Sequence, residues 1–409
     1  MSEWKKVKLG EICERVTSGG TPKANVSSYY NPPTIPWLKT KEVNYCRITE
    51  TENYISEEGL KNSSAKLISP NSVIIAMYGQ GDTAGRVAIN KIPLATNQAC
   101  CNLTIDKSKA DYEFIYYQLC TLYDKLVSLK AGAAQPNLNA RIIKNLEIIM
   151  PSLPIQHRIA TILSRYDSLI ENYQKQIKLL EEAAQRLYKE WFIDLHFPGH
   201  ENTNIIDGVP DGWEKKTIDD VTCKVTTGLN PRKNFVLGKG SNYYVTIKNM
   251  ADNTLFLDDR CDRVDNEALE KINKRSDLKI GDILFSGIGT IGRVALVDIP
   301  TNNWNVSESV FTLRVNDIVT KEFLYLMLLS PDMQNYCQSN AHGAAQKGIR
   351  MADLKAYSFY LPPFGVIQKF TNLVTPTIKK VSSIRNQIRL LTEARDRLLP
   401  QLMSGRIVL

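Results

Sequence analysis

The chain has 409 residues, with 51 lysines and arginines against 43 aspartates and glutamates and a formal net charge of +8 at pH 7. This length is too great for one ordinary core, because domains typically hold roughly 100–200 residues, so we expect two or three domains. No apolar run approaches the roughly 20 residues that cross a bilayer, and the start MSEWKKVKLG lacks a signal-peptide core, so we expect a cytoplasmic protein that does not enter membranes.

Residues 1–152 predict a mixed globular domain, with short strands such as SVIIAMY and helices such as YEFIYYQLCTLYDKL. After the break at PSLP, residues 153–208 predict one long helix and a linker. In this helix apolar residues return at alternating steps of four and three, which is the a/d spacing of a coiled-coil seam. The predicted seam consists of Ile159, Leu163, Tyr166, Ile170, Tyr173, Ile177, Leu180, Ala184, Leu187 and Trp191.

Residues 209–360 predict a second mixed domain, with strands such as DILFSG and a helix over KEFLYLMLLSPDMQNYC. After LPPFG, residues 361–409 predict a second long helix with the same spacing. Its seam consists of Phe370, Val374, Thr377, Val381, Ile384, Ile388, Leu391, Arg395, Leu398 and Leu402. Because an apolar seam is not stable in water, each long helix needs a surface to pack against.

The two halves repeat one another in the same order, which is a sign of internal duplication. GRVA occurs at 85–88 and again at 292–295, and GAAQ occurs at 132–135 and again at 343–346. Two helices of matched length and phase are each other's obvious partners, and an internal pseudo-twofold axis would place them antiparallel. We therefore predict an α+β protein in which two similar globular domains are separated by an antiparallel two-helix coiled coil of roughly 50 Å. The alternative, in which each helix packs only on its own domain, stays open.

Two similar but non-identical domains on a rigid spacer suit the reading of two separated half-sites on duplex DNA. Half-sites that face one side of the duplex lie roughly 34–36 Å apart, so the spacer length becomes part of the specificity. A non-catalytic scaffold whose two heads bind proteins is the competing hypothesis. An enzyme hidden in one head is a further alternative, although no paired carboxylate, Cys/His or Ser/His arrangement recurs in the sequence.

Several motifs stand in a fixed order along the chain: the helix opening LPIQHRI, the segments LEEA and LYKEWF, then LTEA and the final LLPQLMSG. Together with the ordered duplication, they resemble the specificity subunit of a type I restriction-modification system. The resemblance covers nearly the whole chain and implies two target-recognition domains, one for each half of a bipartite site in double-stranded DNA. It also implies that the helices bind two modification subunits, which methylate adenine with S-adenosylmethionine. Restriction subunits, which use ATP and Mg²⁺, complete such a complex, whereas this chain would hold no cofactor.

A net charge this mild means that a DNA-binding surface must be a local face. We expect phosphate contacts from Lys, Arg and hydroxyl groups in loops, and base contacts from Arg, Lys, Asn and Gln. In the first domain the candidates are Lys23, Tyr29, Lys39, Lys41, Tyr78, Gln80, Arg86, Gln135 and Asn137. In the second domain they are Arg232, Lys233, Tyr243, Lys248, Asn249, Arg293, Gln346, Lys347 and Arg350. The alternative for Arg86 and Arg293, which the repeat shares, is that they hold a turn.

Three patterns that suggest other chemistry are better explained by turns and linkers. GIGTIG at 287–292 has the spacing of a dinucleotide loop, but the strand-like RVALV follows where a helix is needed, so we predict a tight hairpin. His196 and His200 stand four apart, but a Pro-Gly pair between them excludes the helix of a zinc-binding pair. NPPT at 31–34 lacks the aromatic residue that would stack on a flipped base. We therefore predict neither a catalytic residue nor a metal site in this chain.

Overall fold

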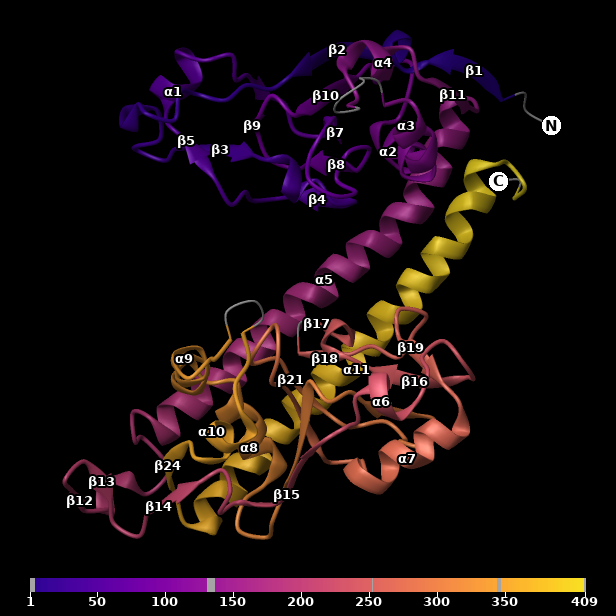
Figure 1. Ribbon diagram of the computed structural model, residues 1–409. Coiled ribbons are helices and arrows are strands. Elements are labelled where there is room, and N and C mark those ends of the chain that lie inside the picture. The colour runs from indigo at the N-terminus through magenta and orange to yellow at the C-terminus, as the bar shows by residue number, and fades with distance from the viewer. Residues whose placement is uncertain (1–3, 131–136, 252, 344–346, 408–409) are drawn as a thin grey trace. The chain divides into compact units, whose positions relative to one another are not determined.

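The computed structural model describes residues 4–130, 137–251, 253–343 and 347–407. The chain forms two compact units: unit 1 comprises residues 1–172 and 388–409, and unit 2 comprises residues 173–387. Strands and helices are mixed in both units, and each unit includes one end of each long helix (Figure 1). The predicted α+β fold class is therefore confirmed.

Unit 1 is built on a five-stranded sheet. Its order is β2 (Cys13–Ser18), β10 (Cys100–Ile105), β7 (Val73–Ala76), β8 (Val87–Asn90) and β4 (Cys46–Ile48). A second sheet has the order β5 (Tyr54–Ile55), β3 (Ile35–Leu38), β9 (Leu94–Thr96) and β6 (Leu67–Ile68). A separate pair joins β1 (Lys5–Lys8) to β11 (Glu147–Met150). The strand β7 is the apolar run VIIA, and all its residues are buried, as expected for a strand covered on both faces.

The helices of unit 1 outside the long pair are short. They are α1 (Glu57–Lys61), α2 (Tyr112–Thr121), α3 (Tyr123–Ser128) and α4 (Ala140–Lys144). The helix predicted over YEFIYYQLCTLYDKL is in fact two helices, because the chain leaves helical geometry at Leu122. Asp111 caps the start of α2 by accepting a hydrogen bond from the backbone N–H of Phe114 at 2.9 Å. From there α2 packs against β7 and β8 of the five-stranded sheet.

Unit 2 repeats this plan with a four-stranded and a three-stranded sheet. The first has the order β15 (Thr222–Thr227), β23 (Val310–Val315), β20 (Ile283–Ser286) and β21 (Val294–Leu296). The second has the order β19 (Asp262–Val264), β16 (Asn242–Val245) and β22 (Trp304–Val306). Two-stranded pairs join β14 (Glu214–Thr217) to β24 (Ser358–Leu361), β12 (Ile205–Ile206) to β13 (Val209–Pro210), and β17 (Met250–Ala251) to β18 (Thr254–Leu255). The parallel pair β16 and β22 matches the parallel pair β3 and β9 of unit 1, so the duplication extends to strand pairing.

The remaining helices of unit 2 are also short. They are α6 (Pro231–Asn234), α7 (Asn266–Ser276), α8 (Lys321–Leu328), α9 (Pro331–Ser339) and α10 (Met351–Lys355). The single helix predicted over KEFLYLMLLSPDMQNYC is wrong, because Pro331 has no backbone N–H to continue α8 and instead begins α9. GIGTIG lies in the turn that joins β20 to the antiparallel strand β21, which confirms the predicted hairpin.

The long helices are α5 (Leu153–Phe192) and α11 (Phe364–Met403), each of 40 residues and about 60 Å at 1.5 Å per residue. All the predicted seam residues of both helices are buried or half-buried. The a/d spacing therefore identified the packed faces of the two helices. Within the ranges that the structure describes, no helix is both long and apolar enough to span a membrane.

In unit 2 the two long helices pack against each other in antiparallel directions. Glu181 of α5 pairs with Arg385 of α11 at 2.5 Å. Further along α5, the Trp191 ring lies 5.7 Å from the ring of Phe370, which stands earlier in α11. Trp191 and Phe370 share one hydrophobic core with Phe323 of α8, so the contact between the two long helices is also part of the core of unit 2.

In unit 1 the other ends of the same helices meet. Leu163 of α5 belongs to the same core cluster as Leu402 of α11 and Phe114 of α2. Asp167, one turn later in α5, pairs with Arg395, which lies earlier in α11, at 2.7 Å. The helices are thus antiparallel in unit 1 as well. There α2 contributes to the same core through Phe114.

A buried ion network joins β4 to α5 in unit 1. Arg47 of β4 is enclosed by three carboxylates, at 3.4 Å from Glu113, 3.2 Å from Asp167 and 3.3 Å from Glu171. Its Nη2 also donates a hydrogen bond to the Tyr117 hydroxyl at 3.0 Å. Burial by itself would lower the pKa of Arg47, but these neighbours raise it, so the guanidinium stays charged. The network therefore links β4 and α2 to α5 within unit 1.

Candidate nucleic-acid interface

In unit 1, the loop after β2 touches the end of β9 so closely that only glycine fits. A Cβ atom added to Gly19 would lie 2.1 Å from the backbone oxygen of Thr96. The next carbonyl, that of Gly20, accepts a hydrogen bond from Trp37 Nε1 of β3 at 3.1 Å. Thr21 stands two residues after Gly19, and Gln98 stands two residues after Thr96. The Thr21 hydroxyl donates a hydrogen bond to Oε1 of Gln98. This junction therefore holds an exposed amide side chain at a defined place.

Unit 2 has the same junction with different side chains. A Cβ atom on Gly228 would lie 1.6 Å from the backbone oxygen of Val306, at the end of β22. Asn230 stands two residues after Gly228, and Glu308 stands two residues after Val306. Asn230 Nδ2 donates a hydrogen bond to Glu308 Oε1 at 2.9 Å. The pairs Thr21–Gln98 and Asn230–Glu308 thus correspond in the two units.

Tyr244 of β16 takes the place of Trp37 in unit 2. Its hydroxyl oxygen lies 2.7 Å from the backbone oxygen of Leu229 and 3.1 Å from Glu308 Oε2, so one proton is shared between two acceptors. Burial, and then the neighbouring carboxylate of Glu308, raise the pKa of Tyr244. The hydroxyl therefore stays protonated, and its one proton serves the Leu229 carbonyl and the Glu308 carboxylate.

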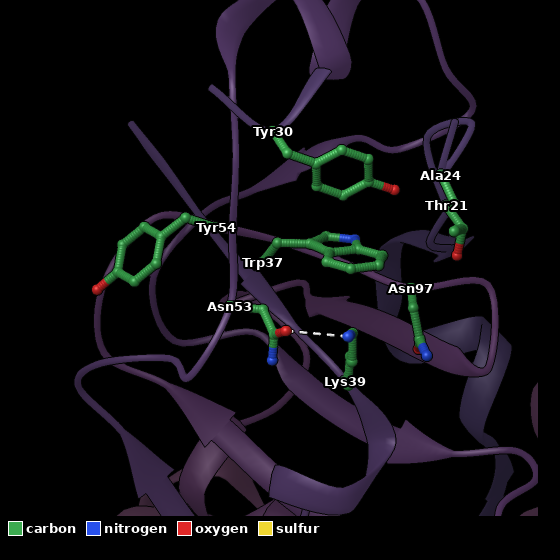
Figure 2. Close-up of a pocket in the computed structure, with 8 residues that line it drawn as sticks. All are labelled: Thr21, Ala24, Tyr30, Trp37, Lys39, Asn53, Tyr54 and Asn97. Atoms are coloured by element: carbon green, nitrogen blue, oxygen red, sulfur yellow. Dashed lines mark hydrogen bonds between the residues drawn. The ribbon is translucent and has the colours of Figure 1, made fainter. Parts of the chain in front are cut away.

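An open pocket of about 540 Å³ lies beside the junction of unit 1 (Figure 2). Its lining includes Thr21, Tyr30, Trp37, Lys39, Asn53 and Asn97. Figure 2 shows the Tyr30 ring on one side of the Trp37 indole and the Lys39 and Asn53 side chains on the other. Lys39 Nζ donates a hydrogen bond to Asn53 Oδ1 at 2.9 Å and lies 5.1 Å from the centre of the Trp37 ring. A cation and two amides in the lining suit contact with a polyanion.

The other predicted contact residues of unit 1 differ in their exposure and in whether another side chain already binds them. Lys23 and Gln80 are exposed, whereas Tyr29, Tyr78 and Asn137 are half-buried. Lys41 is exposed and forms an ion pair with Glu52. Arg86 is half-buried, and its guanidinium donates hydrogen bonds to Asp82 at 2.5 Å and to Asn44 at 3.0 Å. Gln135 lies outside the described residues.

In unit 2 most of the predicted cations face solvent. Arg232, Lys233, Lys248, Lys347 and Arg350 are exposed. Tyr243 is half-buried beneath the guanidinium of Arg263, which lies 3.8 Å from the centre of its ring. Gln346 lies outside the described residues.

Two predicted residues of unit 2 serve the fold. Asn249 is 1% exposed, and its Oδ1 accepts a hydrogen bond from the backbone N–H of Thr246 at 2.9 Å. We leave Asn249 out of the proposed interface, because this side chain cannot reach a ligand. Arg293 Nη1 donates to the backbone oxygen of Ile247 at 2.9 Å, which matches the alternative that this shared arginine holds a turn.

Sequence reasoning missed Thr21, Gln98, Asn230 and Glu308. Each pair joins residues 77 or 78 positions apart, so no local pattern links its members. The available signal was a Ser-Gly or Thr-Gly pair at a similar place in each half, Ser18-Gly19 and Thr227-Gly228, because Thr21 and Asn230 each stand two positions after its glycine.

The family model described as "Type I restriction modification DNA specificity domain" matches residues 1–182 and, a second time, residues 210–388. The chain belongs to this family. The internal repeat and the family resemblance inferred from the sequence are thereby confirmed. Specificity subunits of type I systems provide DNA sequence recognition and are not the catalytic subunits, so the role of this chain is recognition.

Relatives within the family cover nearly the whole chain. The chain is 29% identical over 415 residues to the type I restriction enzyme MjaIX specificity subunit of Methanocaldococcus jannaschii, covering 99% of this chain and 94% of that one. It is 22% identical over 482 residues to the HindI specificity subunit of Haemophilus influenzae, covering 100% of both. Among solved structures, the S subunit of the type I restriction-modification system of M. genitalium covers 98% of this chain and 96% of its own, with a TM-score of 0.63 and 18% identity. This last likeness supports the fold.

Proposed function

We propose that this chain reads a bipartite sequence in double-stranded DNA, one half-site with each unit, and directs adenine methyltransferase subunits to it. The observation that carries the proposal is the pair of matching junctions. The same glycine contact and the same hydrogen bond from an aromatic side chain to a loop carbonyl occur in both junctions, which carry Gln98 in unit 1 and Glu308 in unit 2. A duplicated scaffold that presents different polar side chains is what two different half-sites require.

Both long helices carry exposed leucines that suit partner subunits. In unit 1 these are Leu169 of α5 and Leu390 of α11, which are 40% and 50% exposed. In unit 2 they are Leu179 and Leu373, which are 65% and 56% exposed. Large apolar side chains on otherwise polar helix faces favour protein contacts. We infer that these faces bind two modification subunits, which would hold S-adenosylmethionine, and that restriction subunits with ATP and Mg²⁺ join the complex.

Methylation mapping tests this function directly. The chain is co-expressed with a modification subunit of a type I system in a host that lacks other adenine methyltransferases, and methylated adenines are mapped across the genomic DNA. We expect a motif of two short sequences separated by a fixed gap, and no methylation when either subunit is expressed alone. A single contiguous motif, or methylation that ignores sequence, would contradict the proposal.

Arg350 provides a test of phosphate contact in unit 2. It is exposed at the start of α10, close in sequence to exposed Lys347. We expect Arg350→Ala to weaken DNA binding by the assembled complex about 3- to 10-fold and to reduce the slope of log K against log salt by about one. Fluorescence anisotropy with a labelled duplex at several salt concentrations measures both quantities.

The matched control is Arg275→Ala, since Arg275 is an exposed arginine of α7 outside the predicted set. It should leave both the affinity and the slope unchanged. Equal behaviour of the two variants would remove Arg350 from the interface. A duplex affinity without any salt dependence would favour the protein scaffold over DNA recognition.

A further inference from the structure

Glu308 places a negative charge within the proposed DNA-binding surface of unit 2, where positive charge is expected. Its partner Asn230 directly precedes α6, whose Arg232 and Lys233 are exposed. A carboxylate beside phosphates is repelled, and a hydrogen bond that it accepts from a base offsets this cost. In the major groove, the donors open to a carboxylate are the exocyclic amino groups, above all N4 of cytosine.

The Glu308 side chain is also pre-organised for such a contact. Asn230 Nδ2 binds Oε1 at 2.9 Å, and the Tyr244 hydroxyl lies 3.1 Å from Oε2. A carboxylate has about four acceptor positions, so two remain after these bonds. Glu308 is half-buried, so the residue is not fully enclosed by the protein. Little rotamer freedom is left to lose on binding, which favours discrimination between bases.

Gln98 offers different chemistry at the corresponding place in unit 1. Thr21 donates to its Oε1, while the NH₂ group keeps two donors and Oε1 keeps a second acceptor position. Gln98 is exposed beside Asn97, which lines the open pocket (Figure 2). A side chain with both a donor and an acceptor matches the N7 and N6 edge of adenine.

We propose that Gln98 and Glu308 are corresponding base-reading residues, and that Gln98 recognises an adenine while Glu308 recognises the amino group of a cytosine. The inference rests on the proposed function and assigns a specificity-determining position to each half-site. It requires an A·T pair in the half-site of unit 1 and a G·C pair in that of unit 2.

The experiment uses the chain assembled with the modification subunit, and duplexes in which each base pair of the mapped motif is replaced in turn. For the wild type, replacing the recognised C·G pair by T·A should slow methylation roughly 10- to 100-fold. For Glu308→Gln, this discrimination should fall below about 3-fold at that pair alone, because the amide presents a donor as well as an acceptor. Discrimination at the other pairs should persist.

Each result is a ratio between duplexes for one preparation, so a partly unfolded variant does not imitate it. Glu270→Gln, at an exposed glutamate of α7, is the matched control and should keep the wild-type profile. If Glu308→Gln is inactive on every duplex, Gln98→Glu supplies the same comparison in unit 1. An unchanged profile in the active variant overturns the inference, whereas absence of a bipartite motif in the wild type overturns the proposed function.

Discussion

Arg47→Met is expected to lower the free energy of unfolding by about 3–5 kcal/mol, since removing one partner from a buried ion cluster leaves uncompensated charge behind. The Arg47 side chain is only 6% exposed, and those of Glu113 and Asp167 are 15% and 9% exposed. Methionine keeps much of the apolar volume, so the loss reports the charge and not a cavity. Urea unfolding, followed by circular dichroism, measures the change in free energy.

The remaining partners of Asp167 and Glu113 indicate which carboxylate would be left without a sufficient counter-charge. Besides Arg47, Asp167 has Arg395 at 2.7 Å and the Tyr117 hydroxyl at 2.5 Å, whereas among the described residues the only other cation paired with Glu113 is Lys91 at 3.1 Å. Glu113→Gln in the Arg47→Met background should therefore restore part of the stability. Arg141→Met, at an exposed arginine of α4, is the control and should change the free energy by about 0.5 kcal/mol or less. A loss below about 1 kcal/mol for Arg47→Met would show that the network is not a stabilising element.

Phe370→Ala should destabilise unit 2 by about 3–5 kcal/mol, the usual range for removing a fully buried aromatic side chain. Phe370 of α11 is 0% exposed. Its ring lies 4.7 Å from the ring of Phe192, 5.7 Å from that of Trp191 and 6.2 Å from that of Tyr188, all of α5. The substitution would leave a cavity between α5 and α11. We expect the surrounding side chains to fill it only in part, so most of the lost packing is not recovered.

Phe364→Ala supplies the same chemical change on the same helix at a site that is 48% exposed. It should lower the free energy of unfolding by less than about 1 kcal/mol. Both variants are measured by urea unfolding and by recovery of the complex with the modification subunit. We expect Phe370→Ala to reduce that recovery and Phe364→Ala to have the smaller effect. Similar losses in the two variants would argue against a helix-to-helix seam in unit 2.

The long helices were the most predictable part of this fold. Their period of alternating four and three residues is a local property of the chain, and it marked the buried faces of α5 and α11 correctly. The hairpin at GIGTIG was equally local, because the strand-like RVALV follows the last glycine directly. Helix breaks were less predictable: Pro331 signalled one, but nothing in the sequence around Leu122 marks the break between α2 and α3.

The candidate site was predicted only in part. A preference for charged and amide side chains in loops predicted Lys39, which lines the pocket, and Arg232 and Arg350, which are exposed. The same reasoning selected Asn249, which is buried, because composition does not distinguish a side chain that caps a turn from one that faces solvent. It could not select Glu308, since a carboxylate was not sought on a surface expected to be basic.

By itself the sequence determined the duplication, the two helical seams and the family, because each depends on residue order and short-range periodicity. Tertiary structure alone decided which polar groups meet. The Arg47 network joins β4, α2 and α5, and the Asn230–Glu308 bond joins residues 78 positions apart. Such contacts depend on how strands and helices pack, and packing brings together side chains whose separation along the chain carries no periodic signal.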